Sequence, residues 1–207
     1  FYFKNSKIYS GDIYPDLYRY KSERITNFFI DTSSEESIRK NLLNNEVDFE
    51  IIIEDAGHSL KDQIISLFLL FRKIKSKGLF ITEELDFPDT RQDMNINNEK
   101  PSLRNILLSV KEKKNFNSKY IAEDDKRYFL ENYDSIEIFK GNMNEISIIK
   151  KKWNMDKNLE IFCVTNKHLS FFDNIEYKLA AVGKNNFPSN YITSDTQDNI
   201  FHKEEYY

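Results

Sequence analysis

The stretch DFEIIIEDAGHSLKDQIISLFLLF, residues 48–71, joins a predicted strand to a predicted helix through a polar turn. The three consecutive isoleucines at 51–53 are typical of a parallel strand that is covered on both faces. From Leu60 onward, apolar residues recur at helical spacing. The turn between the two elements contains two acids and a histidine: Glu54, Asp55 and His58. This stretch therefore predicts a β-α unit with reactive side chains at the carboxyl end of its strand.

The flanking sequence repeats the same alternation of strand and helix. Further strands are predicted at residues 7–13, 24–31 and 77–85, further helices after residues 31 and 101, and a hairpin around residues 141–144. This order predicts an α/β fold with a mostly parallel sheet that closes with an antiparallel hairpin. The polar residues 86–100 predict a long loop, and loops of that length are often functional.

After residue 152 the pattern restarts with a fresh strand signal. We therefore expect a first domain over residues 1–152, a linker over residues 153–158 and the beginning of a second domain over residues 159–207. The alternative is a C-terminal extension that packs on the first domain.

Composition excludes several classes of function. The net charge of −4 and the interspersed charges argue against a nucleic-acid partner, and the longest apolar run is too short to span a membrane. The single cysteine, Cys163, excludes an internal disulfide and fits a reducing compartment, so we expect a cytoplasmic protein. With three dispersed histidines and one cysteine, a Cys/His zinc site is not expected.

Acidic residues end each of the four predicted parallel strands. In open α/β sheets, ligands bind beyond the carboxyl ends of the strands, so these acids should line one edge. They are Asp12, Asp31, Glu54-Asp55 and Glu83-Glu84. An acid in this position can simply cap the next helix, and for Asp31 that explanation is at least as good. Clustered acids repel one another unless a cation lies between them, and oxygen ligands suit Mg²⁺.

Alternation along a strand places Glu54 and Asp55 on opposite sides, which makes Asp55 the better candidate ligand. His58 follows one short turn later, close enough to act as a base on a group held there. The alternative is that His58 only leads into the helix and bonds the backbone.

Two motifs occur in order along the chain. Residues 54–58 read Glu-Asp-Ala-Gly-His, and residues 77–85 begin with Lys-Gly and end with Glu-Glu-Leu. The macrocin O-methyltransferase-like group, related to the cephalosporin hydroxylases, typically has D-D-G-S-H and G-G-x-x-x-x-E-D-L at these places. Over residues 7–150 the chain thus resembles class I S-adenosylmethionine-dependent methyltransferases, which have a Rossmann-like sheet.

The resemblance implies a role for each candidate residue. Asp12 corresponds to the acid that holds the ribose of S-adenosylmethionine, and Asp31 to a position near its adenine. His58 corresponds to the general base. The implied Mg²⁺ ligands are Asp55, Glu83 and Glu84, and Asp55 also belongs to the implied donor site. The glycine-rich first strand-loop of the family is absent from the sequence, so we expect the first β-α unit to be missing, as in an N-terminally truncated piece.

The C-terminal part has a second resemblance. Residues 165–167, 182–183 and 195–200 are similar to the start of a glycosyltransferase-like domain found in capsular and surface polysaccharide clusters. Together the two resemblances imply an Mg²⁺-assisted O-methyltransferase that acts on a sugar hydroxyl in glycan or polysaccharide biosynthesis. Its partner would be a sugar, sugar nucleotide or glycan, and a homo-oligomer is compatible with this interpretation.

Two other functions are alternatives. The first is a catalytically degenerate methyltransferase fold beside a glycosyltransferase, where it serves as a scaffold or as a module that binds sugar nucleotides. The second is a hydroxylase-like relative, which needs a redox iron site that three dispersed histidines do not favour.

Overall fold

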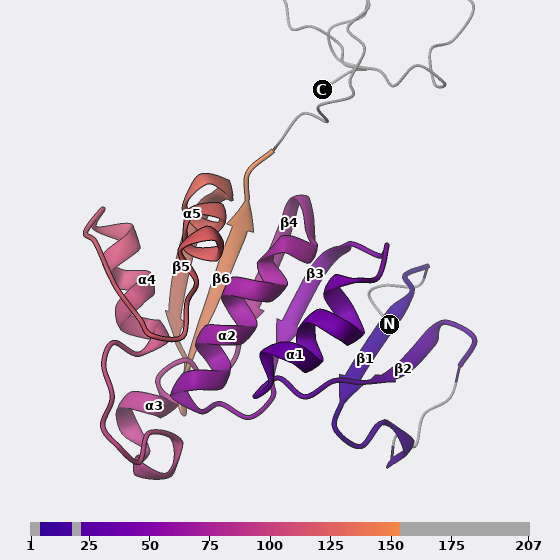
Figure 1. Cartoon of the computed structure of the whole chain (residues 1–207), viewed down its shortest axis with the longest axis horizontal. Helices are drawn as coiled ribbons and strands as arrows, with labels where there is room; N and C mark the ends of the chain where they lie inside the picture. Colours follow the sequence, from indigo (N-terminus) through magenta and orange to yellow (C-terminus); the bar gives the residue numbers. More distant parts are fainter. Residues whose placement is uncertain (1–4, 18–21, 154–207) are drawn as a thin grey trace, which may run out of the picture. The chain divides into compact units, whose positions relative to one another are not determined.

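A computed structural model of the chain describes residues 5–17 and 22–153. These residues form an α/β unit whose strands pair in two sheets (Figure 1). Apart from Trp153, the predicted linker and the predicted glycosyltransferase-like domain over residues 159–207 lie outside the described residues.

The first sheet consists of β1 (Ile8–Asp12) and β2 (Ile25–Phe29), which pair in parallel. The second has the order β3-β4-β6-β5. In it, β3 (Phe49–Glu54) and β4 (Ile74–Thr82) are parallel, and the hairpin of β5 (Tyr133–Lys140) and β6 (Glu145–Lys151) pairs antiparallel to β4. The predicted α/β class, its parallel pairs and its closing hairpin are confirmed.

Serine caps begin three of the helices, because their side-chain oxygens accept backbone N–H groups that would otherwise have no partner. Ser34 caps α1 (Glu35–Ile38), Ser59 caps α2 (Leu60–Leu70) and Ser102 caps α4 (Leu103–Lys111). The remaining helices are α3 (Phe87–Thr90) and α5 (Glu123–Asn132). Short 3₁₀ turns lie at Pro15–Leu17, Phe71–Lys73 and Gln92–Met94, and a π turn, Arg39–Leu43, extends α1.

Helix α2 is the centre of the core. Nine of its 11 residues are buried, and Figure 1 shows it lying in front of the second sheet, where it contacts β4. On the sheet face toward the helices, Phe80 and Ile149 are fully buried at paired positions of β4 and β6. On the other face of β3, Ile53 is 59% exposed. The strong burial of α2 holds its first turn rigidly at the carboxyl edge of β3.

Two elements differ from the sequence prediction. Residues 86–100 are not simply a loop, because α3 and a 3₁₀ turn lie within them. Helix α5 was not predicted because it is mostly polar, with only Asp125 and Phe129 buried. Within residues 5–17 and 22–153, none of the helices combines the length and the hydrophobicity needed to cross a membrane.

Candidate functional site

The candidate site lies where β3 and β4 end. The two strands run in parallel, with Glu54 opposite Thr82, and the Glu83 amide donates to the Glu54 carbonyl over 3.0 Å. This register brings the turn at residues 54–58 beside Glu83 and Glu84. Two motifs that are about thirty residues apart in the sequence therefore meet at one edge of the sheet, as expected for a ligand site of this fold.

His58 occupies the centre of this edge. Its Nε2 atom lies 3.0 Å from Oε2 of Glu84 and 3.6 Å from Oδ1 of Asp55. Its side chain is only 14% exposed, and the Phe87 ring packs edge-on at 5.8 Å between ring centroids. The imidazole is thus held by an aromatic side chain from α3 and by carboxylates from two strand ends.

The backbone of this site has an uncommon conformation. His58 has φ 53° and Glu84 has φ 52°, both in the left-handed region that few non-glycine residues adopt. Such residues are enriched at functional sites, because the surrounding structure has to stabilise them. Here the left-handed turns direct the two side chains toward each other.

The two ring nitrogens of His58 have different surroundings. Nε2 faces the carboxylates of Glu84 and Asp55, whereas Nδ1 is buried and has no hydrogen-bond partner among the described residues. The predicted alternative, a histidine bonded to backbone, does not match the side-chain contacts that the structure gives.

Gln63 is a supporting residue that the sequence analysis missed. It is fully buried on α2, and its Nε2 donates to the Glu84 carbonyl over 3.0 Å. This bond stabilises the left-handed turn that carries the Glu84 carboxylate. The signal in the sequence was a lone amide within an otherwise apolar helix face.

Glu54 points into the protein, whereas Asp55 points out. Glu54 is 4% exposed and the Asp55 side chain 60%, in agreement with the predicted alternation along the strand. The Glu54 Oε1 atom accepts the Ala56 amide at 3.2 Å, while Oε2 is buried with no hydrogen-bond partner among the described residues. Burial raises the pKa of Glu54 to about 7. The hydrogen bond from the Ala56 amide lowers this pKa, and the nearby acids Asp55, Asp62 and Glu83 raise it further.

The carboxylates of Asp55 and Glu84 lie near each other, since both contact His58 Nε2, and their side chains are 60% and 26% exposed. Two partly exposed carboxylates fit Mg²⁺, which is usually held by one or two carboxylates and several waters. In the described part of the chain, no group of three or more His, Cys, Asp or Glu side chains is arranged to hold a metal. The three-ligand set that includes Glu83 therefore stays a prediction.

Asp12 ends β1, Asp31 lies two residues after the end of the neighbouring parallel strand β2, and both carboxylates accept hydrogen bonds from the chain that follows. Asp12 Oδ1 accepts the Tyr14 amide at 2.7 Å. Asp31 Oδ1 accepts the amide and hydroxyl of Ser33 at 2.9 and 2.7 Å. Asp31 thus bonds the turn that leads into α1, but the residue that caps α1 is Ser34.

Comparison with solved structures identifies relatives of this fold. The MycE methyltransferase from the mycinamycin biosynthetic pathway, in complex with Mg and SAH, superposes with a TM-score of 0.53 and 16% identity, covering 71% of this chain and 38% of that one. A second MycE structure, with Mg, SAH and mycinamycin VI, gives a TM-score of 0.53 and 18% identity, covering 71% of this chain and 36% of that one. The chain has the fold of these methyltransferases. It spans less than two fifths of their length. No family model and no curated protein matches the sequence.

Proposed function

We propose that the protein is an S-adenosylmethionine-dependent, Mg²⁺-assisted O-methyltransferase that acts on a sugar hydroxyl. The observation that carries this proposal is His58, held between Asp55 and Glu84 at the carboxyl edge of β3 and β4. It is supported by the fold shared with MycE, whose structures contain Mg and SAH, and in one case mycinamycin VI.

His58 would act as the general base. A sugar hydroxyl is a poor nucleophile until its proton is removed, and the neutral imidazole of His58 would accept that proton. The carboxylates of Glu84 and Asp55 lie beside Nε2 and would hold the ring in position. The hydroxyl oxygen then bonds to the methyl carbon as the carbon–sulfur bond breaks, and in-line positioning of oxygen, carbon and sulfur lowers the barrier.

Asp55 and Glu84 are the residues that would hold Mg²⁺, with Glu83 as the predicted third ligand. Bound Mg²⁺ would supply positive charge that orients acceptor oxygens and lowers the pKa of a coordinated hydroxyl. Glu54 lies behind the site and bonds the Ala56 amide, which fixes the turn between Asp55 and His58.

The methyl donor would bind beside this site, with Asp12 at the ribose and Asp31 near the adenine. Among the described residues, β1 pairs only with β2, and β3 pairs only with β4. The Tyr9 ring of β1 lies 5.4 Å from the Phe49 ring of β3, so side chains of the two sheets are in contact at this place.

The biosynthetic context is also a proposal. The resemblance over residues 159–207 to a glycosyltransferase-like domain supports a role in glycan or polysaccharide assembly. In that case methylation and glycosyl transfer would act on the same acceptor.

Isothermal titration calorimetry of the protein with Mg²⁺, and then with S-adenosylmethionine, tests the proposal. Asp55→Asn is expected to lower Mg²⁺ affinity at least about tenfold, whereas the exposed control Glu50→Gln is expected to leave it unchanged. Mg²⁺ affinity that is equal in wild type, Asp55→Asn and Glu84→Gln would rule out this site. A protein that binds Mg²⁺ but no donor would favour the scaffold alternative.

A further inference from the structure

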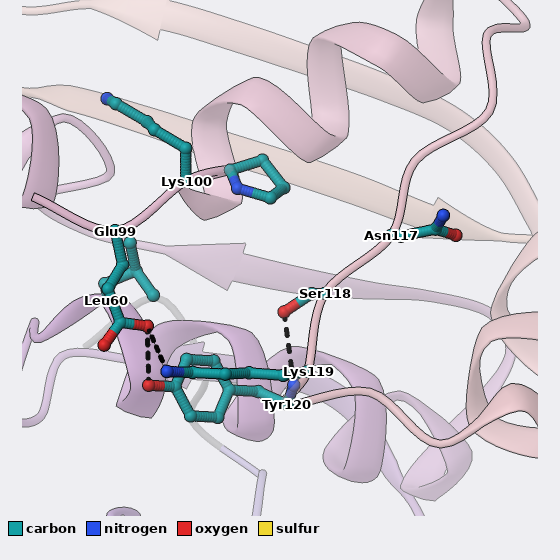
Figure 2. Close-up of a pocket in the computed structure, with 8 residues that line it drawn as sticks. Leu60, Glu99, Lys100, Asn117, Ser118, Lys119 and Tyr120 are labelled. Carbon is teal, nitrogen blue, oxygen red and sulfur yellow. Dashed lines mark hydrogen bonds and ion pairs between the residues drawn. The ribbon is translucent and has the colours of Figure 1, made fainter.

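A cavity of about 400 Å³ lies beside the candidate site and takes no part in the chemistry described above. It is open to solvent and is lined by the first turn of α2, the segment before α4 and the segment before α5 (Figure 2). Its lining includes Leu60, Glu99, Pro101, Asn117, Lys119 and Tyr120. Its volume is within the range of small-molecule sites, roughly 300–1,000 Å³.

The cavity is close to the proposed catalytic base. Leu60 lines the cavity two residues after His58, so their Cα atoms are at most about 7 Å apart. Residues 87–99 begin beside the His58 site and reach the cavity at Glu99. Phe87 contacts the His58 ring, and the buried Asn95 side chain bonds both the Pro88 and the Glu99 carbonyls at 3.1 Å. The cavity and the His58 site are therefore joined both through the start of α2 and through residues 87–99.

The polar wall of the cavity is organised around Glu99. Its Oε2 atom accepts the Tyr120 hydroxyl at 2.8 Å and the Lys119 ammonium at 2.9 Å, and Figure 2 shows the three side chains grouped on one wall. The Lys119 hydrogen bond and the Tyr120 hydrogen bond hold the pKa of Glu99 below its usual value. Glu99 is thus an ionised acceptor, while Tyr120 and Lys119 are held in place beside it.

The lining also contains a second cation, Lys100, whose ammonium pairs with Asp89. Leu60 and Pro101 contribute aliphatic surface, Asn117 contributes an amide, and Tyr120 contributes a ring that has the Lys119 ammonium over it at 5.0 Å from the centroid. Because each lysine of the lining is paired with a carboxylate, the lining is nearly neutral, which disfavours a phosphate or another strongly charged ligand. Hydroxyl groups suit the carboxylate and amide, while the C–H face of a sugar ring suits the aromatic and aliphatic surface.

We propose that this cavity is a second saccharide subsite, which binds the neutral glycosyl residue that adjoins the methylated one. The inference rests on the proposed function, and it names a substrate class: an acceptor of at least two linked units rather than a free monosaccharide. Glu99 would accept hydroxyl protons, Tyr120 would contact the ring face, and Lys119 would keep both in position.

The test is saturation-transfer NMR on the whole chain, with maltose, cellobiose and lactose as probes and glucose and galactose as matched monosaccharides. Glu99→Gln removes a charged acceptor and is expected to weaken binding about tenfold. Asn117→Trp fills the cavity from an exposed position and is expected to abolish binding, while the exposed control Lys111→Gln leaves it unchanged.

At least one disaccharide should bind more tightly than both monosaccharides and should lose binding in Asn117→Trp. If no disaccharide binds, or if binding is equal in Glu99→Gln, Asn117→Trp and wild type, the subsite is refuted. Calorimetry with S-adenosylmethionine on the same samples separates the two proposals. Donor binding without disaccharide binding overturns the subsite alone, and disaccharide binding without donor binding overturns the methyltransferase proposal.

Discussion

The buried carboxyl of Glu54 should make the stability of the protein depend on pH. Its pKa is about 7 in the folded protein, raised mainly by burial, against an ordinary value of 4.5. Between these two values the folded state holds a proton that the unfolded state has released. The free energy of unfolding therefore falls as the pH rises from about 4.5 to about 7, and at about 1.4 kcal/mol per pH unit this group accounts for about 3 kcal/mol.

Glu54→Gln removes the ionisable group but keeps an oxygen that can accept the Ala56 amide. Relative to wild type, we expect the variant to gain about 3 kcal/mol of unfolding free energy between about pH 5 and about pH 8.5. Urea denaturation at both pH values, with EDTA present so that no metal binds, measures this difference.

The matched control is Glu137→Gln, whose side chain is exposed on β5. Its unfolding free energy should stay within about 0.5 kcal/mol of wild type, as for most surface substitutions. If Glu54→Gln and wild type showed the same pH dependence within that margin, Glu54 could not be buried as the structure has it.

Three further changes probe the site and the fold. Glu84→Gln removes the carboxylate beside His58 Nε2, and should lower the rate of methyl transfer about a hundredfold while leaving the thermal midpoint nearly unchanged. A variant as active as wild type would exclude Glu84 from catalysis. Gln63→Met removes the donor to the Glu84 carbonyl and should reduce kcat/KM severalfold, which steady-state kinetics would measure; full activity would mean that this bond does not position Glu84. Gly78→Ala would place a Cβ atom 2.7 Å from the Glu50 carbonyl oxygen, so we expect the free energy of unfolding to fall by about 2 kcal/mol or more. Urea denaturation measures this change, and an unchanged midpoint would contradict the close approach.

Much of the fold was predictable because the sequence patterns are local. The apolar run of β3, the serine cap of α2 and the alternating hairpin strands each act over a few residues, and each is present in the structure. Helix α5 escaped prediction because its stability comes from tertiary contacts. Asp125, for example, pairs with Arg72, 53 residues away, and Phe129 packs between Phe68 and Phe71.

The candidate site was predictable in part for the same reason. Alternation along β3 separated Asp55 from Glu54, and the turn spacing placed His58 near Asp55. The pairing of His58 with Glu84 depends on strand register and on two left-handed backbone turns, which no local pattern encodes. The cavity beside Glu99 could not be predicted either, because it is formed by three segments that are far apart in the sequence.

The central claim is that His58 and its carboxylates catalyse Mg²⁺-assisted methyl transfer to a sugar. Its most direct test is transfer of a labelled methyl group from S-adenosylmethionine to the saccharide probes, compared in Mg²⁺, in EDTA and in His58→Ala. We expect transfer in Mg²⁺ that is abolished by EDTA and reduced roughly 10²–10⁴-fold in His58→Ala. Transfer that survives both EDTA and His58→Ala, or no transfer to any probe in Mg²⁺, would contradict the claim.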